Sequence, residues 1–287
     1  MVYSLPTHHM SECPQMNPGS ARSDKTPPIS FAKEEYRKAI HAWLRNWENN
    51  LMFGNNIHEF LEIQRKVLQE CLYETAVWWY KYILQHSNKV VLWTQWDRWN
   101  QEFKIQSCWL LRTIAHHILW EKTQYSKNVL DIYNRVILEI HNDKVKQLWN
   151  IINRRTRNTE EIYKNYVLID DRIENLLWAY KEIKNSWIPS YFVWILDPRH
   201  NNAIDKSNYI NNVRKKIEES DDAEWFLKYL LVDDNFNASL LWDIIQTKNL
   251  QDVLFLVDFD SVVFNTQKYI ENCTEKILEF VFEKKKS

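Results

Sequence analysis

The segment Asp170–Glu174 reads Asp-Asp-Arg-Ile-Glu and contains paired carboxylates at a spacing that suits metal binding. Asp170 and Asp171 are adjacent, and Glu174 follows one helical turn later. Carboxylates arranged in this way on one helix face can share Mg²⁺ ions, and those ions can hold a diphosphate. The two aspartates also fall where a link between helices is expected, and there they would cap the next helix. Asp170, Asp171 and Glu174 are therefore metal ligands only if the chain is a diphosphate enzyme, and otherwise no metal site is predicted.

Three tryptophans, Trp93, Trp96 and Trp99, recur at every third residue. A stripe of this kind is typical of a core between helices. It could also line a groove for a partner, because Trp and Arg dominate the binding energy of many protein interfaces. Trp93, Trp96 and Trp99 are therefore candidate partner-binding residues, with burial in the core as the alternative.

The densest arginine cluster in the chain consists of Arg154, Arg155 and Arg157, in a predicted link between two helices. Arginine binds phosphate through paired hydrogen bonds, and aromatic side chains stack on bases. The cluster could therefore contact RNA or another polyanion, together with the nearby Trp149 and Tyr163. The alternative is a solvated link whose charges favour the C-terminal end of the preceding helix.

The composition restricts the elements that could position these residues. The 287 residues include only 2 glycines and 15 tryptophans. Glycine-rich phosphate loops, dinucleotide-binding turns and tight β-hairpins all need glycine, so the composition argues against them. A formal net charge of −1 argues against a chain that binds polyanions over its whole surface. No cofactor is predicted.

The periodicity of apolar residues predicts helices. Apolar side chains recur three and four residues apart in 58–84, 130–140 and 161–183, and no proline interrupts residues 29–188. We therefore expect about nine to twelve helices and an all-α fold. Five of the 7 prolines fall in the first 28 residues, which predicts a disordered or loosely docked arm over residues 1–30. Residues 31–287 are predicted to form one all-helical repeat domain.

Two segments, 82–98 and 136–154, repeat the same order of an apolar helix end, an Asn-containing link and a Leu-Trp pair that opens the next helix. Weaker repeats follow in 166–183 and 213–231. This pattern predicts an irregular α–α superhelix of helical hairpins, in which each pair buries its apolar face against the next pair. Three tryptophans should then be buried at the junctions between pairs: Trp149, Trp178 and Trp225.

A helix, a short Asn or Asp link and a Trp near the start of the next helix resemble the repeats of protein prenyltransferase α-subunits, over about residues 77–282. The resemblance implies a crescent of paired helices and a β-subunit partner that carries the zinc and most of the active site. It also implies that Lys144, five residues before Trp149, contacts a diphosphate. The Asn-Tyr pair and the Arg of the family's repeat are missing here, and half-tetratricopeptide repeats of RNA-processing factors are similar too. The Asp-Asp-x-x-Glu segment resembles a motif of terpene cyclases.

These observations lead to one main functional prediction and two alternatives. The main prediction is a non-catalytic or partner-dependent helical-repeat scaffold that binds another protein, and a heterodimer is one form that this binding would take. The first alternative is an isoprenoid-diphosphate enzyme, either a prenyltransferase subunit or a terpene-cyclase-like protein. The second is an RNA-processing repeat protein, so a nucleic-acid partner is possible but not favoured.

The four cysteines are widely separated and form no Cys-x-x-Cys pair, which favours free thiols in a reducing compartment. The first residues lack the basic and apolar segments of a secretory signal. No window approaches the length of apolar sequence that a membrane span needs. We therefore expect an intracellular protein, cytoplasmic or nuclear, without a membrane span.

Overall fold

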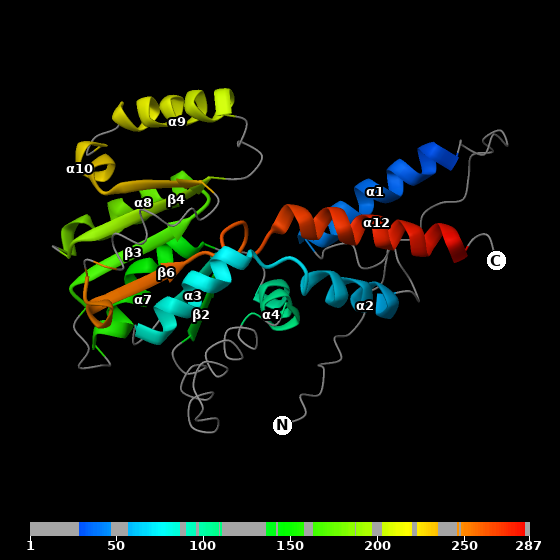
Figure 1. Ribbon diagram of the computed structural model, residues 1–287, viewed down its shortest axis with the longest axis horizontal. Helices are drawn as coiled ribbons and strands as arrows, with labels where there is room; N and C mark the ends of the chain where they lie inside the picture. Colours follow the sequence, from blue (N-terminus) through cyan, green and yellow to red (C-terminus); the bar gives the residue numbers. More distant parts are fainter. Residues whose placement is uncertain are drawn as a thin grey trace, which may run out of the picture.

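Six parallel β-strands form the centre of the molecule, so the predicted all-α superhelix is wrong (Figure 1). The computed structural model describes residues 29–46, 57–86, 90–95, 98–108, 110, 136–141, 143–157, 163–186, 188–196, 203–219, 223–234, 246 and 248–284. Helices cover the sheet, which gives an α/β arrangement in place of stacked helical hairpins. The predicted arm over residues 1–30 lies almost wholly outside the described residues, which begin at Ile29.

The last strand in the sequence lies in the middle of the sheet. The strand order is β2-β1-β6-β3-β4-β5, and every neighbouring pair is parallel. Strand β6 pairs with β1 on one side, where Val90 faces Phe255, and with β3 on the other, where Tyr166 faces Leu254. The strands comprise β1 (Val90–Gln95), β2 (Val136–His141), β3 (Asn165–Asp170), β4 (Ser190–Leu196), β5 (Leu230–Asp234) and β6 (Val253–Val257).

The central strands are short apolar runs that are buried on both faces. All five residues of β6, Val-Leu-Phe-Leu-Val, are buried, as are the last five residues of β3. Such continuous runs are typical of parallel strands, because helices cover both faces of a parallel sheet. Alternate residues of one strand belong to different cores: Val90 and Leu92 pack in one cluster, and Val91 and Trp93 in the other.

Helices on the two faces of the sheet complete these two cores (Figure 1). One core includes residues of α3 (Glu74–His86) and α4 (Arg98–Ser107). The other core contains residues of four helices: α7 (Lys144–Arg157), α8 (Ile173–Ile183), α9 (Ala203–Glu218) and α10 (Ala223–Lys228). Short 3₁₀ turns follow α8 at Lys184–Ser186 and precede β6 at Leu250–Asp252.

Three helices from opposite ends of the described chain form a unit beside the sheet (Figure 1). They are α1 (Ile29–Asn46), α2 (Ile57–Leu68) and α12 (Thr266–Lys284). Helix α12 packs against both others, with Arg37 paired to Glu275 and the rings of Phe60 and Phe280 5.9 Å apart. We call α1, α2 and α12 the three-helix unit.

Two adjacent segments connect the three-helix unit to the sheet. The Tyr73 N–H donates to the carbonyl of Val263 at 3.0 Å, and the Asn265 N–H donates to the carbonyl of Cys71 at 2.7 Å. These bonds flank an isolated antiparallel bridge between Leu72 and Phe264. The unit is therefore held to the sheet by paired backbone as well as by side chains.

The predicted burial of the junction tryptophans is also wrong. Trp178 is 58% exposed and Trp225 is 57% exposed, because both lie on the outer faces of helices that cover the sheet. The side chain of Trp149 is not among those described. The repeat pattern that those tryptophans suggested therefore does not correspond to a helical-hairpin register.

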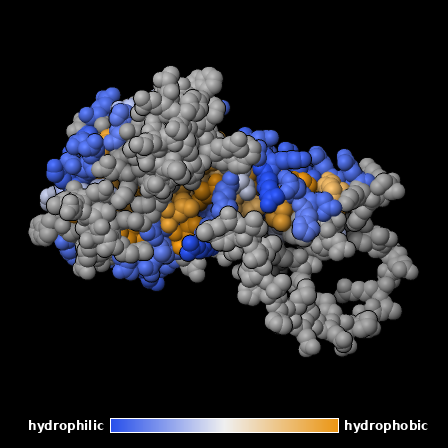
Figure 2. Space-filling view, turned by 90° about the horizontal axis from the view of Figure 1, so that it is seen from below, coloured by the Kyte–Doolittle hydropathy of each residue, from blue (hydrophilic) through white to orange (hydrophobic). Residues whose placement is uncertain are grey.

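The described residues bear on the predicted absence of a membrane span and on the predicted free thiols. None of the helices in the described ranges is long and apolar enough to cross a bilayer. Seen from below, the molecule has an apolar area near its middle and mainly hydrophilic residues over the three-helix unit (Figure 2). Cys71, Cys108 and Cys273 are buried free thiols, and Cys13 lies outside the described residues.

Candidate functional site

Polar residues gather where the three central strands end. Thr94 and Gln95 end β1, Asp170 ends β3, and Asp258 follows β6 directly. After β1 the chain continues to β2 on one side of β6, and after β3 it continues to β4 on the other. In α/β sheets, ligands bind outside the carboxyl ends of strands at such a divergence. A cavity of about 610 Å³ lies there, between the sheet and the three-helix unit.

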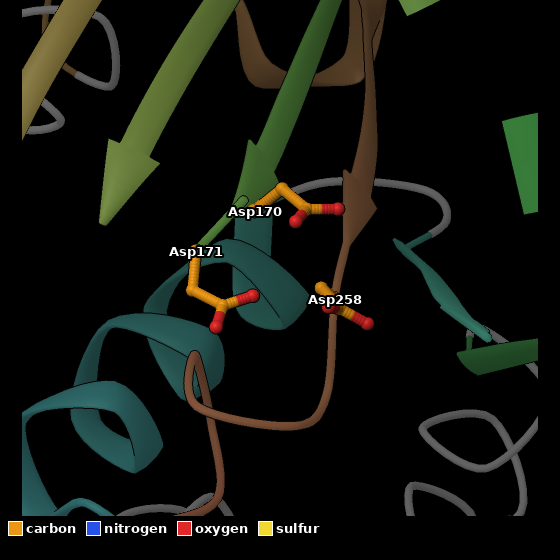
Figure 3. A group of neighbouring side chains, drawn as sticks. All are labelled: Asp170, Asp171 and Asp258. Carbon is orange, nitrogen blue, oxygen red and sulfur yellow. The ribbon is translucent and has the colours of Figure 1, made fainter. Parts of the chain in front are cut away.

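Three carboxylates form the centre of this site. Asp170 and Asp171 lie at the end of β3, and Asp258 lies opposite them at the end of β6 (Figure 3). One oxygen from each lies within 4.8 Å of the others. Asp171 and Asp258 line the cavity, whereas Asp170 is fully buried behind them. This spacing suits a divalent cation bound by oxygen ligands.

Lys144, the first residue of α7, lies within the carboxylate cluster. Its Nζ is 2.6 Å from Asp170 Oδ2 and 3.0 Å from Asp258 Oδ2, and the side chain is 1% exposed. The ammonium also lies 4.8 Å from the centre of the Trp93 ring. Burial alone would lower the pKa of Lys144, but the charges of Asp170 and Asp258 outweigh it and raise the pKa. Lys144 is therefore charged and bridges β3 and β6.

One ammonium does not neutralise three carboxylates. Burial raises the pKa of Asp171 to about 8, with further contributions from the charges of Asp258 and Asp170. Burial also raises the pKa of Asp258 to about 7, although Lys144 acts in the opposite direction. Both shifts have the sign expected of a site with excess negative charge. A divalent cation would supply the missing positive charge and favour the ionised carboxylates.

Asp170 is held by its own loop and helix as well as by Lys144. Its Oδ1 accepts hydrogen bonds from the Arg172 backbone N–H at 2.8 Å and from Asn175 Nδ2 at 3.1 Å. Asn175 Nδ2 also lies 3.2 Å from Asp170 Oδ2. These bonds fix the turn between β3 and α8, so that Asp171 and Arg172 are presented to the cavity.

A second charged pair, Asp260 and Lys104, lies on the other side of the turn after β6. Lys104 Nζ of α4 contacts both oxygens of Asp260, at 2.7 and 2.8 Å. Gln101 Nε2 donates to Asp260 Oδ2 at 2.5 Å, and Thr266 Oγ1 donates to Oδ1 at 2.9 Å. Burial would raise the pKa of Asp260, but these partners, Lys104 first, lower it. Asp260 is therefore an ionised carboxylate at the cavity wall.

The structure brings some of the predicted site residues together and separates others. Lys144, Asp170 and Asp171 meet in the cluster, but Glu174 is exposed on α8 and is not part of it. The third carboxylate of the cluster, in place of Glu174, is that of Asp258, directly after β6. Whether Lys144 contacts a phosphate group stays a prediction.

Of the predicted partner-binding residues, only Trp93 has a described side chain, so a shared surface stays a prediction. Trp93 is fully buried, and its Nε1 donates to the Lys144 carbonyl at 3.0 Å. Trp96 lies outside the described residues, and the side chain of Trp99 is not described. The side chains of the arginine cluster are not described either, but its backbone belongs to α7 and not to a link: Arg154, Arg155 and Arg157.

Sequence reasoning missed Lys104, Asp258 and Asp260. One signal was present, because a run of apolar residues directly precedes Asp170 and another, Val253–Val257, directly precedes Asp258. Two adjacent parallel strands that share a site at their carboxyl ends would show this pattern, a buried apolar run followed directly by aspartate. Lys104 had no comparable signal.

Comparison with known proteins gives no family for this arrangement. No protein-family model, no curated protein and no solved structure matches the chain. The functional argument therefore depends on the geometry of the site.

Proposed function

We propose that the chain is a Mg²⁺-dependent phosphohydrolase that acts on phosphate monoesters. One observation carries the proposal: Asp171 and Asp258 face one cavity, with Asp170 and the Lys144 ammonium directly behind them. Carboxylates from two strand ends are the ligands that Mg²⁺ takes when substrate phosphate oxygens complete its coordination. The scaffold prediction has lost its basis, because it depended on an all-α crescent.

The cavity offers the groups that binding a phosphate monoester needs. Mg²⁺ held by the three aspartates would attract the phosphate oxygens and neutralise part of their charge. Thr94 lies at the cavity wall at the end of β1, where its hydroxyl can donate to a phosphate oxygen. Its contact with the Gln95 carbonyl is long, at 3.5 Å, so this hydroxyl is not strongly engaged.

Asp258 is the nucleophile in this proposal. It is the aspartate that both lines the cavity and lies 3.0 Å from an ammonium that favours its ionised form. An Asp258 oxygen bonds to phosphorus, the bond from phosphorus to the ester oxygen breaks, and the leaving oxygen takes a proton from solvent. Lys144 acts here as a positioning residue, because it holds Asp258 and Asp170 at fixed separation.

Asp260 serves the second step. As an ionised carboxylate at the cavity wall, it takes a proton from the water whose oxygen attacks the phosphorus of the aspartyl-phosphate. The bond from Asp258 to phosphorus breaks, inorganic phosphate leaves, and Asp260 returns its proton to solvent. Over both steps, one ester and one water become one alcohol and one phosphate.

Hydrolysis of p-nitrophenyl phosphate by the purified chain tests the reaction. We expect release of nitrophenol that needs Mg²⁺, stops in EDTA and is abolished by Asp258→Asn. Asp252→Asn is the matched control, because Asp252 forms an ion pair with Lys164 away from the cavity. Activity that persists in EDTA, or in Asp258→Asn protein, refutes the proposal.

The covalent step has its own test. Acid quenching of the chain during turnover of a radiolabelled phosphate ester should trap label on Asp258, and peptide mapping should locate it. Full Mg²⁺-dependent activity without trapped label, at a quench faster than turnover, would mean that a metal-bound water attacks phosphorus directly.

Metal binding can be measured without turnover. Mg²⁺ should raise the melting temperature of the wild-type chain, and Asp171→Asn should remove most of that rise. Glu174→Gln is the control, because Glu174 belongs to the same sequence motif but is exposed outside the cluster. An equal loss in both variants contradicts the assignment of Asp171 as a ligand.

The other functional predictions have no supporting contact among the described residues. A protein partner, an RNA partner and an isoprenoid-diphosphate substrate stay predictions, as do the intracellular location and the prenyltransferase resemblance. Farnesyl diphosphate belongs in the substrate panel, because it carries the diphosphate that the Asp170–Glu174 pattern suggested.

A further inference from the structure

The cavity is larger than the phosphate group that the carboxylate cluster would hold. Its volume of about 610 Å³ is typical of sites for whole small molecules. From Asp171 and Asp258 it extends to Leu44 of α1 and Ile270 of α12. The part of the substrate that leaves as an alcohol would therefore contact cavity residues outside the carboxylate cluster. The side chains of those residues would determine which leaving groups are accepted.

Most charged and amide side chains on these walls are already engaged within the protein. Lys104 contacts both oxygens of Asp260, and Lys268 Nζ donates to the Glu70 carbonyl at 2.7 Å. Asn175 donates to Asp170, and Gln267 donates to Glu271 in a short hydrogen bond. These groups would have to give up a partner to bind substrate.

Arg172 is different, because its guanidinium has no partner among the described residues. Arg172 is exposed and is one of the residues that line the cavity. Its backbone is nevertheless fixed, since its N–H donates to Asp170 Oδ1 at 2.8 Å and its carbonyl accepts from Asn175 and Leu176. Arg172 thus carries a cation that is unpaired among the described residues, on a backbone that is fixed next to Asp171.

We propose that Arg172 selects phosphate monoesters whose leaving group carries a second anionic group, either a carboxylate or another phosphate. The proposal rests on the proposed phosphohydrolase function and adds the substrate class. A guanidinium offers parallel N–H donors that match the oxygens of both anions. Helix α8 begins at Ile173, directly after Arg172, so the positive end of its dipole favours the same anion.

The negative residues of the cavity limit where the second anion can lie. Asp171, Asp258 and Asp260 surround the place of the transferred phosphate, and Glu271 lies on α12. A second anion near any of these would be repelled. Among the described cations that line the cavity, only Arg172 is not engaged by a protein oxygen of the described residues, so the second anion binds beside α8.

Matched pairs of substrates test the proposal. 3-Phosphoglycerate and glycerol 3-phosphate differ mainly by a carboxylate, and fructose 1,6-bisphosphate and fructose 6-phosphate differ by a phosphate. We expect the wild-type kcat/KM to favour the acidic member of at least one pair by about tenfold or more. Arg172→Gln should reduce this ratio to near one, and Arg172→Lys should restore part of it. Lys181→Gln, an exposed change on the same helix, should leave the ratio unchanged.

Two results overturn the proposal. One is a wild-type chain that does not favour the acidic member of either pair. The other is an equal loss for both members of a pair in Arg172→Gln, because Arg172 would then contact the transferred phosphate itself.

Binding separates this proposal from the phosphohydrolase proposal. Calorimetry with Asp258→Asn protein and Mg²⁺ measures affinity for each pair without turnover. Tighter binding of the acidic member that depends on Arg172 supports the role of Arg172 even if the wild-type chain hydrolyses neither compound. A wild-type chain that also fails to hydrolyse p-nitrophenyl phosphate would refute the phosphohydrolase function and leave the role of Arg172 in binding intact.

Discussion

Replacing Lys144 by methionine should destabilise the protein more than any exposed charge change. Methionine keeps most of the length of the side chain but removes the ammonium that lies 2.6 Å from Asp170 and 3.0 Å from Asp258. Because Asp170 and Asp258 are buried, their charges would then lack a cation. Removing one partner of a buried ion pair costs about 3–5 kcal/mol. That is a large part of a typical unfolding free energy of about 5–15 kcal/mol.

The loss should depend on pH and on Mg²⁺ in a defined direction. Burial already raises the pKa of Asp258 to about 7, and removal of Lys144 raises it further. At about pH 5 the folded variant can therefore neutralise the Asp258 carboxyl group by protonation, whereas at about pH 8 it cannot do so without cost. The deficit relative to wild type should be larger at the higher pH. Mg²⁺ should recover part of it by replacing the missing positive charge.

Urea unfolding followed by tryptophan fluorescence measures these differences, in EDTA and in Mg²⁺. Lys146→Met is the control, two residues away, because Lys146 pairs with Asp143 on the surface with 73% of its side chain exposed. We expect no measurable change in that variant. If Lys144→Met loses no more stability than Lys146→Met, or loses the same amount at both pH values, the buried ion pair does not hold β3 and β6 together.

Three further predictions follow from the burial and charges described above. Burial raises the pKa of Asp171 to about 8, so the folded chain binds protons that the unfolded chain releases above about pH 4. In EDTA, thermal melts should therefore show stability falling from about pH 5 to about pH 8, and a flat profile would contradict the shift. Phe192→Ala, at a residue 1% exposed, should cost about 3–5 kcal/mol in urea unfolding, and Trp178→Ala, 58% exposed, should cost less than about 1 kcal/mol. Lys104→Met should lower kcat about tenfold or more with little change in KM, because Asp260 loses the cation that orients it, and steady-state assays with a Lys104→Arg rescue would check this.

The sequence did not reveal the strands, because neither the periodicity nor the composition distinguishes a short buried strand from a buried helix segment. A run such as Val90–Gln95 is too short to show a period, and a buried strand and a buried helix segment look alike at that length. The low glycine content argued correctly against tight hairpins. Parallel strands, however, are connected through helices and need no hairpin. The composition therefore agrees with the parallel sheet as well as it agreed with an all-α fold.

The candidate site was predicted in part. From the sequence, the paired aspartates are metal ligands only under the diphosphate-enzyme alternative, and the structure places both in the carboxylate cluster. The third carboxylate of the cluster could not be found by helical spacing, because Asp258 reaches the cluster through the pairing of β6 with β3. Helical spacing selected Glu174 in its place, which lies outside the cluster. The carboxylate pair at the end of β3 could be recognised from the sequence. That β6 lies beside β3 and brings Asp258 to the same place could be known only from the sheet topology.

The position of β6 has a consequence for how the protein is made. During synthesis, β1 emerges long before β6, and the intervening residues take roughly 8–30 s to translate at about 5–20 residues per second. Until β6 has been made, the strands can form only two separate groups, one of β1 and β2 and the other of β3, β4 and β5. Each group exposes the apolar strand edge that β6 later covers. The nascent chain is then exposed to aggregation at two edges, and a chaperone that binds extended apolar segments would protect it. No fragment that stops before β6 contains Asp258 or Asp260, so the proposed nucleophile and base are present only once the central strand has been made.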